Sequence, residues 1–369
     1  MRVAVVHDWL TGWRGGERVL EQILLLYPDA DLFTLIHLQG SVPASLESRR
    51  IRVSPLSRLP GVGRYYRALL PLFPWAIRRF DLSSYDLVIS CSHAVAKSVR
   101  TGPDTVHVSY CLTPMRYIWD QADAYLGRGL RRALVTPLVR ALRRFDRATS
   151  GPDDVTAFIA ISSTVRDRIA RAYERDACVV YPPVDTDAVT HAAASCDVPG
   201  PFYLLVGGFV PYKREALAID AFRGLDRSLV VAGDGPLRER LEVGAPDNVH
   251  FVGRVPDAEL HALYRDCRAL IYPQEEDFGI IAVEAQAAGS PVIAYRGGGA
   301  LDTVRVPEGG EFFEAHTTAS LRAAIDRFEA READFDGAEL RGCAQGFSIP
   351  QFRQQFARTL EKLLDAEAG

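Results

Sequence analysis

The sequence predicts an α/β protein with parallel sheets arranged in two domains. Three observations support this class. Short apolar strands alternate with helical stretches along the chain, which is typical of parallel sheets. The strand, glycine loop and helix of residues 1–26 have a counterpart that begins at residues 202–214. The length of 369 residues suits two domains of ordinary size.

The expected elements are apolar runs bounded by glycine, proline and polar residues. In the first half the expected strands are residues 1–6, 31–38, 86–90, 106–110 and 157–162, and the expected helices are 17–26 and 163–172. In the second half strands are expected within 202–214, 228–235, 249–255, 270–272 and 291–295, and helices at 257–266, 280–288 and 347–366.

Composition and charge exclude several classes of protein. Apolar residues make up 48% and charged residues 24%, as in ordinary globular proteins. The net charge of −4 argues against a nucleic-acid partner. Six scattered cysteines without a CxxC pair predict no disulfide framework or zinc site. We see no signal peptide and no apolar run of the ~18 residues that a membrane span needs, so we expect a cytoplasmic protein.

The stretch 272–295 predicts a strand, an acidic loop, a buried helix and a second strand. Pro273 ends the first strand, and Gly279 precedes the helix. The N–H groups of Gly279, Ile280 and Ile281 belong to the first turn, where they have no intrahelical acceptor and the helix dipole is positive. They therefore form a candidate phosphate site.

Two glutamates flank this helix start. Glu284 follows one turn inside the helix, where a buried carboxylate needs hydrogen-bond donors, and ribose hydroxyl groups would suit it. Glu276, just before the turn, is placed to face a sugar beyond the phosphate. The alternative is an ordinary αβ unit whose acidic residues only favour the helix dipole.

Residues 127–149 form a basic amphipathic segment that we expect to be interrupted near Pro137. One interpretation is a helix on an anionic membrane surface, and the alternative is a surface helix with an arginine-rich outer face. Asp185 and Asp187 imitate a DxD metal motif, which we discount because the segment is a proline-marked linker.

Several motifs together resemble the retaining glycosyltransferases of family 4, in a subgroup that includes bacterial mannosyltransferase-like enzymes. The first is Glu276, seven residues, then Glu284. The others are His7-Asp8-Trp9-Leu10, Gly15-Gly16-Glu17, the run 110–120, Pro182 to Asp187, and Val210-Pro-Tyr-Lys213. The resemblance implies the GT-B fold, with two Rossmann-like domains facing across a cleft. The implied domains are residues 1–182 and 183–346, with a C-terminal helix at 347–369 crossing back to the first.

The resemblance implies transfer of a hexose or deoxyhexose from a nucleoside-diphosphate sugar, with a GDP-sugar favoured, to a hydroxyl-bearing acceptor. The acceptor is a carbohydrate, a lipid-linked molecule or a small molecule, and the context is polysaccharide or glycoconjugate synthesis. No metal or other cofactor is implied. The expected location is the cytoplasm. If the amphipathic segment 127–149 lies on a membrane surface, the protein would also contact the inner face of the plasma membrane peripherally.

The resemblance assigns site residues in three groups. Glu276 and Lys213 are the expected catalytic residues. The expected donor-binding residues are Gly15, Gly16, Gly208, Lys213, Gly253, Arg254, Val255, Phe278, Gly279, Ile280, Ile281 and Glu284. The expected acceptor-side residues are Asp8, Trp9, Leu112, Thr113 and Arg116.

The chain departs from the subgroup at several of these places. Leu112 stands where a histidine is typical, Gly208 where arginine is frequent, and Ile161 and Ser163 where asparagine and arginine are frequent. The glycine run 297–299, after the expected strand 291–295, predicts close approach of the backbone to a ligand, although the run is shifted against the subgroup pattern. Because leucine cannot hydrogen-bond a hydroxyl group, position 112 predicts a sugar or acceptor that is less hydroxylated there.

Three alternatives share the same nucleotide cradle. One is a UDP-sugar-dependent transferase that acts on a small specialised-metabolite acceptor. Another is a GT-B nucleotide-sugar epimerase, which would convert the donor without an acceptor. The last is a catalytically degenerate nucleotide-binding subunit, which would bind nucleotide without releasing sugar.

Overall fold

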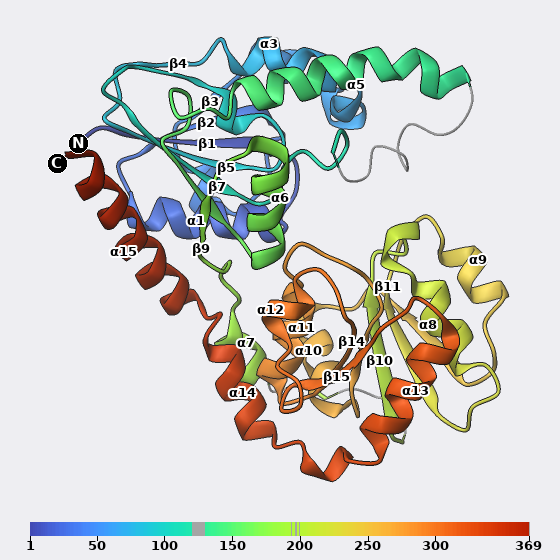
Figure 1. Cartoon of the computed structure of the whole chain (residues 1–369). Helices are drawn as coiled ribbons and strands as arrows, with labels where there is room; N and C mark the ends of the chain where they lie inside the picture. Colours follow the sequence, from blue (N-terminus) through green and yellow to red (C-terminus); the bar gives the residue numbers. More distant parts are fainter. Residues whose placement is uncertain (120–129, 193, 196–197, 199, 369) are drawn as a thin grey trace. The chain divides into compact units, whose positions relative to one another are not determined.

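The computed structural model describes residues 1–119, 130–192, 194–195, 198 and 200–368, with the side chains of 130–134, 367 and 368 left out. The chain divides into two compact units (Figure 1). Unit 1 comprises Met1–Pro183 and Phe352–Gly369, and unit 2 comprises Val184–Gln351. The sequence-based boundaries had been placed after residues 182 and 346.

Unit 1 is built on a seven-stranded parallel sheet. The strand order is β3 (Ile51–Val53), β2 (Asp31–His37), β1 (Val3–Leu10), β5 (Leu87–Ser92), β7 (Val106–Cys111), β8 (Ala157–Ala160) and β9 (Ala177–Val179). A separate pair joins β4 (Asp81–Leu82) to β6 (Arg100–Thr101). The order reverses between β1 and β5, where β1 pairs with β2 on one side and with β5 on the other.

Helices cover both faces of this sheet (Figure 1). They are α1 (Gly15–Leu26), α2 (Ala44–Glu47), α3 (Phe73–Ile77), α5 (Leu130–Ala148), α6 (Ser163–Tyr173) and α15 (Ile349–Ala368), with 3₁₀ turns at Pro55–Arg58, Val62–Arg64, Tyr66–Leu72 and Ala96–Ser98. On α15, Phe352 and Phe356 pack their rings against Tyr110 of β7, each at 5.9 Å between centroids. The C-terminal helix therefore belongs to the core of unit 1.

Unit 2 repeats the architecture with six parallel strands. Their order is β12 (Val249–Gly253), β11 (Ser228–Gly233), β10 (Phe202–Gly207), β13 (Leu270–Tyr272), β14 (Val292–Tyr295) and β15 (Gly310–Phe313). The helices are α7 (Thr186–Thr190), α8 (Glu215–Phe222), α9 (Arg238–Val243), α10 (Asp257–Asp266), α11 (Ile280–Ala288), α12 (Ala300–Thr303), α13 (Thr318–Glu329) and α14 (Gly337–Gln345), with 3₁₀ turns at Pro211–Lys213 and Glu332–Asp334. Here the order reverses between β10 and β13.

Helix α5 corrects one expectation. It continues through Pro137, where an interruption was predicted. Proline removes one backbone hydrogen bond, but the apolar face holds the helix in place because Val139 and Leu142 are buried in the core of unit 1. Residues 127–129 of the predicted segment lie outside the described residues. No described helix has both the length and the apolar character needed to cross a bilayer.

Strand β1 also runs further than predicted. A loop was expected from Asp8 onwards, yet the strand continues to Leu10 with Asp8 fully buried. The Asp8 carboxylate accepts four backbone N–H groups, from His93 and Ala94 on Oδ2 and from Val95 and Ala96 on Oδ1, at 2.7–2.9 Å. These bonds compensate the burial of the charge. Asp8 therefore fixes the loop after β5.

We expect Asp8→Ala to lower the free energy of unfolding of unit 1 by at least about 3 kcal/mol, because four buried N–H groups lose their acceptor. All four tryptophans of the chain, Trp9, Trp13, Trp75 and Trp119, lie in unit 1, so tryptophan fluorescence during urea titration reports on this unit. The matched control is Asp167→Ala, which removes an exposed pair with Arg166 and should cost less than about 1 kcal/mol. Equal midpoints for the two variants would contradict this role of Asp8.

Candidate functional site

The most prominent candidate site lies in unit 2, where the strand order reverses. In open parallel sheets, ligands bind beyond the carboxyl ends of the strands at such a switch point. Strands β10 and β13 are hydrogen-bonded neighbours there. The loop 208–214 leaves the end of β10, and the loop 273–279 leaves the end of β13. These loops carry Lys213 and Glu276, the two residues predicted to be catalytic.

The two side chains meet in an ion pair. Lys213 Nζ lies 3.1 Å from Glu276 Oε1, with the side chains 20% and 22% exposed. The hydroxyl group of Tyr272, a fully buried residue at the end of β13, donates to Glu276 Oε2 at 3.0 Å. The carboxylate is thus held between an ammonium and a phenol. Sequence reasoning did not identify Tyr272 as a partner of Glu276, although it stands only four residues earlier.

The pKa values reflect this pairing. Burial lowers the pKa of Lys213, but the attraction and the hydrogen bond of Glu276 outweigh it, so the pKa is raised from its ordinary value. Lys213 is therefore a cation at neutral pH. Burial raises the pKa of Glu215, which begins α8 and is 2% exposed. Lys213 and nearby backbone groups oppose that rise. Glu215 is a further carboxyl group near Lys213 that sequence reasoning missed.

The backbone around Lys213 is strained. Phe209 and Arg214, on either side of the turn Pro211–Lys213, have φ angles of 40° and 58°, which non-glycine residues rarely adopt. Phe209 is fully buried and packs against Phe251, with the ring centroids 6.1 Å apart. Burial of Phe209 offsets the strain, so the loop holds Lys213 in one position before any ligand binds.

Helix α11 begins at Ile280, as predicted. Its N-cap, Gly279, has φ 95° and ψ 59°, and a Cβ atom there would lie 2.7 Å from the hydroxyl group of Tyr272. The N–H of Ala282 donates to the Gly279 carbonyl, so the preceding N–H groups are first-turn donors. Glycine is required here both for the left-handed backbone and for the tyrosine that holds Glu276.

Glu284 is bound in a similar way. The hydroxyl group of Tyr264, on α10, donates to Glu284 Oε2 at 3.1 Å, and Tyr264 is fully buried. Glu284 itself is half-buried, less enclosed than its place on an apolar helix suggested. Each glutamate of the pair therefore receives a hydrogen bond from a buried tyrosine. No local sequence pattern links Tyr264 to Glu284, because they lie on different helices.

The glycine run 297–299 has a different role from the one expected. Close approach to a ligand was predicted, but the close approach is to the chain itself. A Cβ atom on Gly298 would collide with the Glu276 carbonyl, and one on Gly299 with the backbone of Phe278. The N–H of Gly299 donates to the Glu276 carbonyl at 2.8 Å. The glycines support the loop that carries Glu276.

The other predicted donor residues occupy varied positions. The Phe278 side chain is buried and packs against Phe347, 5.5 Å between centroids, so it does not present a ring to a ligand. Gly208 has open space where a Cβ atom would be. Gly253, with φ 73°, is followed by exposed Arg254 and half-buried Val255 at the end of edge strand β12, which β11 separates from β10.

In unit 1 the predicted acceptor-side residues cluster around the ends of β1 and β7. The carboxylate of Asp8, a residue predicted to lie on the acceptor side, accepts four backbone N–H groups and so supports the 93–96 loop. Trp9 is 5% exposed and lies against His93, 4.4 Å between ring centroids, and against Tyr66.

Leu112, the residue after β7, packs against the start of α1. A Cβ atom on Gly16 would be 3.0 Å from Leu112 Cδ1 and 3.6 Å from His7 Cε1. Gly15 and Gly16 are the first residues of this helix, not part of the loop that was expected before it. Thr113 is buried and Arg116 is half-buried. Leu112 therefore gives the first turn of α1 an apolar neighbour at the position where the subgroup pattern has a histidine.

Buried His7 was not singled out from the sequence, although it begins a quoted motif. Its Nδ1 lies 2.9 Å from the Cys91 carbonyl and its Nε2 lies 4.0 Å from Glu17 Oε1. Burial lowers the pKa of His7 more than the neighbouring carboxylates raise it. A neutral imidazole thus links β1, β5 and α1 beneath Gly16.

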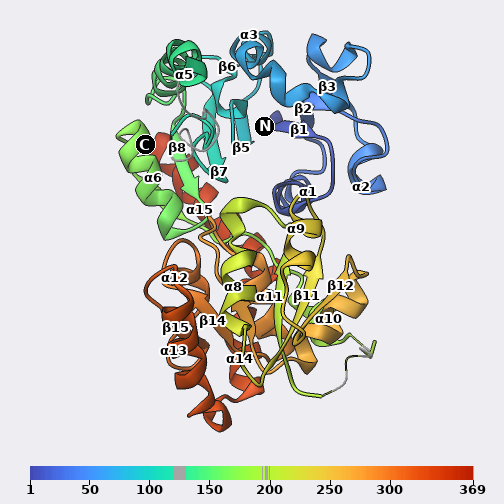
Figure 2. The same ribbon diagram turned by 90° about the vertical axis from the view of Figure 1, so that its right-hand side faces the viewer.

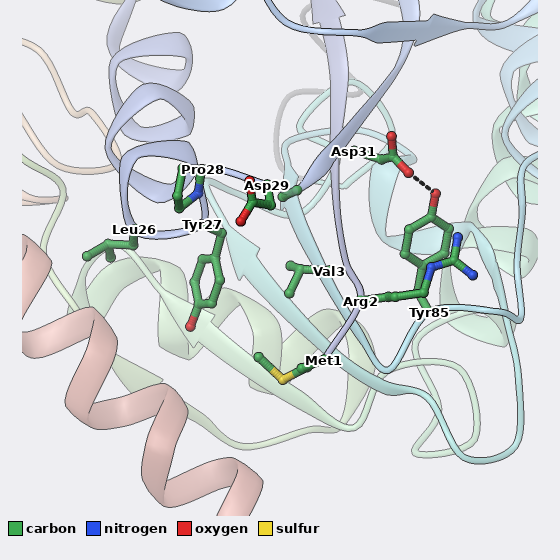
Figure 3. Close-up of a pocket in the computed structure, with 10 residues that line it drawn as sticks. Met1, Arg2, Val3, Leu26, Tyr27, Pro28, Asp29, Asp31 and Tyr85 are labelled. Atoms are coloured by element: carbon green, nitrogen blue, oxygen red, sulfur yellow. Dashed lines mark hydrogen bonds between the residues drawn. The ribbon is translucent and has the colours of Figure 1, made fainter.

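A separate cavity of about 300 Å³ lies at the opposite edge of the unit 1 sheet, at the amino ends of β1 and β2. Figure 3 shows Arg2, Tyr27 and Tyr85 around it, with the Tyr85 hydroxyl group donating to Asp31 at 2.5 Å. The switch-point rule places ligands at the carboxyl edge. This cavity is therefore not part of the candidate site.

Metal chemistry has no evident ligand set. Among the residues that the structure describes, no group of three or more histidine, cysteine, aspartate or glutamate side chains is arranged to hold a metal ion. Asp185 is instead the N-cap of α7, where its carboxylate accepts the Ala188 N–H at 3.1 Å. Helix capping therefore accounts for Asp185, and Asp187 lies in the first turn of the same helix.

Residues 191–341 match the family described as glycosyl transferases group 1. The match covers this segment, which is less than half of the chain. The matched segment contains both loops of the switch point in unit 2, with Lys213, Glu276 and Glu284. The predicted relationship to the glycosyltransferases is thus confirmed for the unit that carries these residues.

Curated relatives of the chain have names of the same kind. A GDP-mannose-dependent alpha-(1-6)-phosphatidylinositol monomannoside mannosyltransferase of Mycobacterium tuberculosis is 32% identical over 217 residues, covering 51% of this chain and 55% of that protein. A D-rhamnosyltransferase of Pseudomonas aeruginosa is 37% identical over 100 residues, covering 25% and 26%. The chain spans about half or less of the length of the curated relatives it matches.

Solved structures share the fold over nearly the whole chain. Anabaena Alr3699/HepE in complex with UDP has a TM-score of 0.71 at 17% identity, covering 98% of this chain and all of that one. Sucrose-phosphate synthase from Thermosynechococcus elongatus has a TM-score of 0.70 at 18% identity, covering 99% and 100%. The predicted GT-B class, with parallel α/β sheets in two domains, is confirmed.

We expect Gly279→Ala to lower the stability of unit 2 by at least about 1–2 kcal/mol, because the new methyl group meets the Tyr272 hydroxyl and the backbone is left-handed. The matched control is Gly208→Ala, where a Cβ atom finds open space in the neighbouring loop. Thermal unfolding followed by circular dichroism measures both variants. A Gly279 variant as stable as the Gly208 variant would show that the tyrosine moves freely.

Proposed function

We propose that the chain is a retaining glycosyltransferase that moves a hexose or deoxyhexose from a nucleoside-diphosphate sugar to a hydroxyl group of an acceptor. The observation that carries this proposal is the Lys213–Glu276 pair, 3.1 Å apart at the switch point of unit 2. When a glycosidic bond to a diphosphate breaks, negative charge gathers on the diphosphate. Lys213 and the first-turn N–H groups of α11 are the positive groups that would stabilise it.

The two glutamates have separate roles in this proposal. Glu276 faces the transferring sugar, because it is joined directly to the lysine that binds the diphosphate. Glu284 accepts hydrogen bonds from the ribose, at the side of α11 that faces Tyr264. One strand, loop and helix of 272–288 would then contact sugar, diphosphate and ribose in order.

We favour GDP as the nucleotide of the donor, with UDP as the alternative. The mycobacterial relative is named as GDP-mannose-dependent, and the Pseudomonas relative transfers rhamnose, a deoxyhexose. In favour of UDP, the Anabaena protein is described with UDP and with UDP-glucose. A 2-deoxystreptamine glucosyltransferase of Streptomyces kanamyceticus, 33% identical over 190 residues, is named for a small acceptor. Thermal shifts with GDP and UDP at the same concentration distinguish the two nucleotides, since a ligand at a hundred times its Kd adds about 2.7 kcal/mol and one at or below its Kd adds less than about 0.5 kcal/mol.

The separate roles of the two glutamates predict different effects for the two alanine variants. Glu276→Ala should leave nucleoside-diphosphate affinity nearly unchanged and lower sugar transfer, because it removes the contact with the sugar and keeps Lys213, the group proposed to bind the diphosphate. Glu284→Ala should weaken nucleoside diphosphate and sugar donor alike by about 1.5–3 kcal/mol, the usual loss for a charged hydrogen-bond partner. Calorimetric titration and turnover assays measure the two effects.

The matched control for Glu276 is Glu275→Ala, one residue earlier and exposed. It should retain transfer. Normal turnover of the Glu276 variant, or unchanged nucleotide affinity of the Glu284 variant with the fold intact, would refute the corresponding role. Tyr272→Phe keeps the carboxylate but removes its hydrogen bond, so it should lower turnover less than Glu276→Ala.

We also propose that transfer needs no metal ion. Lys213 and the start of α11 supply positive charge next to Glu276. Activity should therefore persist in excess chelator. Loss of activity in chelator with recovery on adding magnesium or manganese would contradict this proposal.

A further inference from the structure

Unit 1 contains an apolar cavity of about 260 Å³ next to the end of β1. Its walls come from Trp9 on β1, from the segment with α3, and from α5, which Figures 1 and 2 both show beside α3. The walls include Trp9, Leu70, Phe73, Leu138 and Leu142, and Arg67 is the charged residue among its described walls. We call it the Trp9 pocket.

The segment that supplies one wall of the Trp9 pocket is cationic. Residues 58–80, which include the wall residues Arg67 and Leu70, contain arginines at positions 58, 64, 67, 78 and 79 and neither aspartate nor glutamate, and of these Arg78 is paired with Asp154. The acidic residue in the sequence of α5 is Asp146, which is fully buried with its Oδ1 2.9 Å from Lys97 Nζ. Arg67 and Arg140 are exposed, and Arg67 lines the pocket itself. An apolar hollow with cations near its mouth is complementary to an amphiphilic anion.

We propose that the Trp9 pocket binds the hydrocarbon chain of a lipid-linked acceptor, next to a phosphate or diphosphate that Arg67 and its neighbours recognise. This inference rests on the proposed transferase function and names its acceptor class. Trp9 connects the pocket to the switch point of unit 1, where β1 meets β5. The cavity is slightly smaller than typical small-molecule sites, so it takes the first few carbons of a chain and not a whole lipid.

Contact with a bulk bilayer would use different residues. Leu72 and Trp75 are 46% and 51% exposed on the same segment but do not line the pocket. A bilayer contact depends on such protruding side chains. A chain site depends instead on the concave wall, including half-buried Leu70. The adjacent positions 70 and 72 therefore distinguish a lipid acceptor from a membrane surface.

The test is calorimetric titration of the full chain, without sugar donor, with alkyl phosphates from ethyl to dodecyl below their micellar concentrations. We expect saturable binding to one site, with affinity rising about fourfold per added methylene until the pocket is full. Decanol should bind more weakly than decyl phosphate because it lacks the charge. Affinity that does not depend on chain length overturns the chain site, and equal binding of decanol overturns the phosphate preference.

Paired variants locate the binding. Leu70→Glu should weaken decyl phosphate at least about tenfold, because a charge then faces the chain, whereas Leu72→Glu should change it less than about threefold. Arg67→Ala should weaken decyl phosphate but not decanol, and Arg64→Ala should weaken neither. Equal losses at 70 and 72, with binding to phosphatidylglycerol vesicles lost in parallel, would assign the surface to a bilayer and overturn the acceptor site.

Two features keep the outcome clear. If Leu70→Glu fails to fold, as judged by tryptophan fluorescence, Leu138→Glu at 37% exposure replaces it. The binding assay contains no nucleotide sugar, so it is independent of the transferase assay. If the chain binds alkyl phosphates but transfers sugar to no acceptor, the pocket proposal stands and the transferase proposal is wrong. If it transfers sugar but binds no alkyl phosphate, the transferase proposal stands and the pocket proposal is wrong.

Discussion

The ion pair between Lys213 and Glu276 can exist only if two loops from different strands are kept together. Each loop follows a strand end and contains exposed residues, so its position depends on the strand that carries it. Because β10 pairs with β13, the two loops begin side by side. The strained backbone at Phe209 and Arg214 directs Lys213 toward the neighbouring loop. Preorganisation of this kind reduces the cost of ordering the site when a ligand binds.

The loop of Glu276 is held from three directions. Tyr272 holds its carboxylate, Gly299 holds its carbonyl, and Gly279 leaves room for the tyrosine. Unit 1 achieves the same result at its own switch point by a different route, because Asp8 collects four N–H groups of the loop after β5. In both units a buried polar side chain near the end of a strand positions a loop. In unit 2 the loop follows the same strand, and in unit 1 it follows the neighbouring strand.

The elements with strong periodicity were predictable from sequence. Helix α11 and strand β13 have the expected bounds, because the glycine caps and the proline break act locally. The strand containing Asp8 was cut short in prediction because a charged residue reads as a loop unless its distant partners are known. The tyrosines were missed for the same reason: Tyr264 reaches Glu284 from another helix, and only packing sets that direction. The glycines at 297–299 were recognised as a place of close approach, but sequence does not say whether a ligand or the chain approaches.

Unit 1 differs in chemistry from unit 2. The switch point of unit 2 presents paired charges, whereas that of unit 1 presents Leu112 against Gly16 and Trp9 against an apolar cavity. A hydroxyl-rich acceptor would leave hydroxyl groups unpaired against such walls, at a cost of roughly 1–3 kcal/mol each. A hydrocarbon chain has no such cost and gains from leaving water. The apolar side chains at positions 9 and 112 are therefore consistent with one cause, an acceptor whose part nearest unit 1 is apolar.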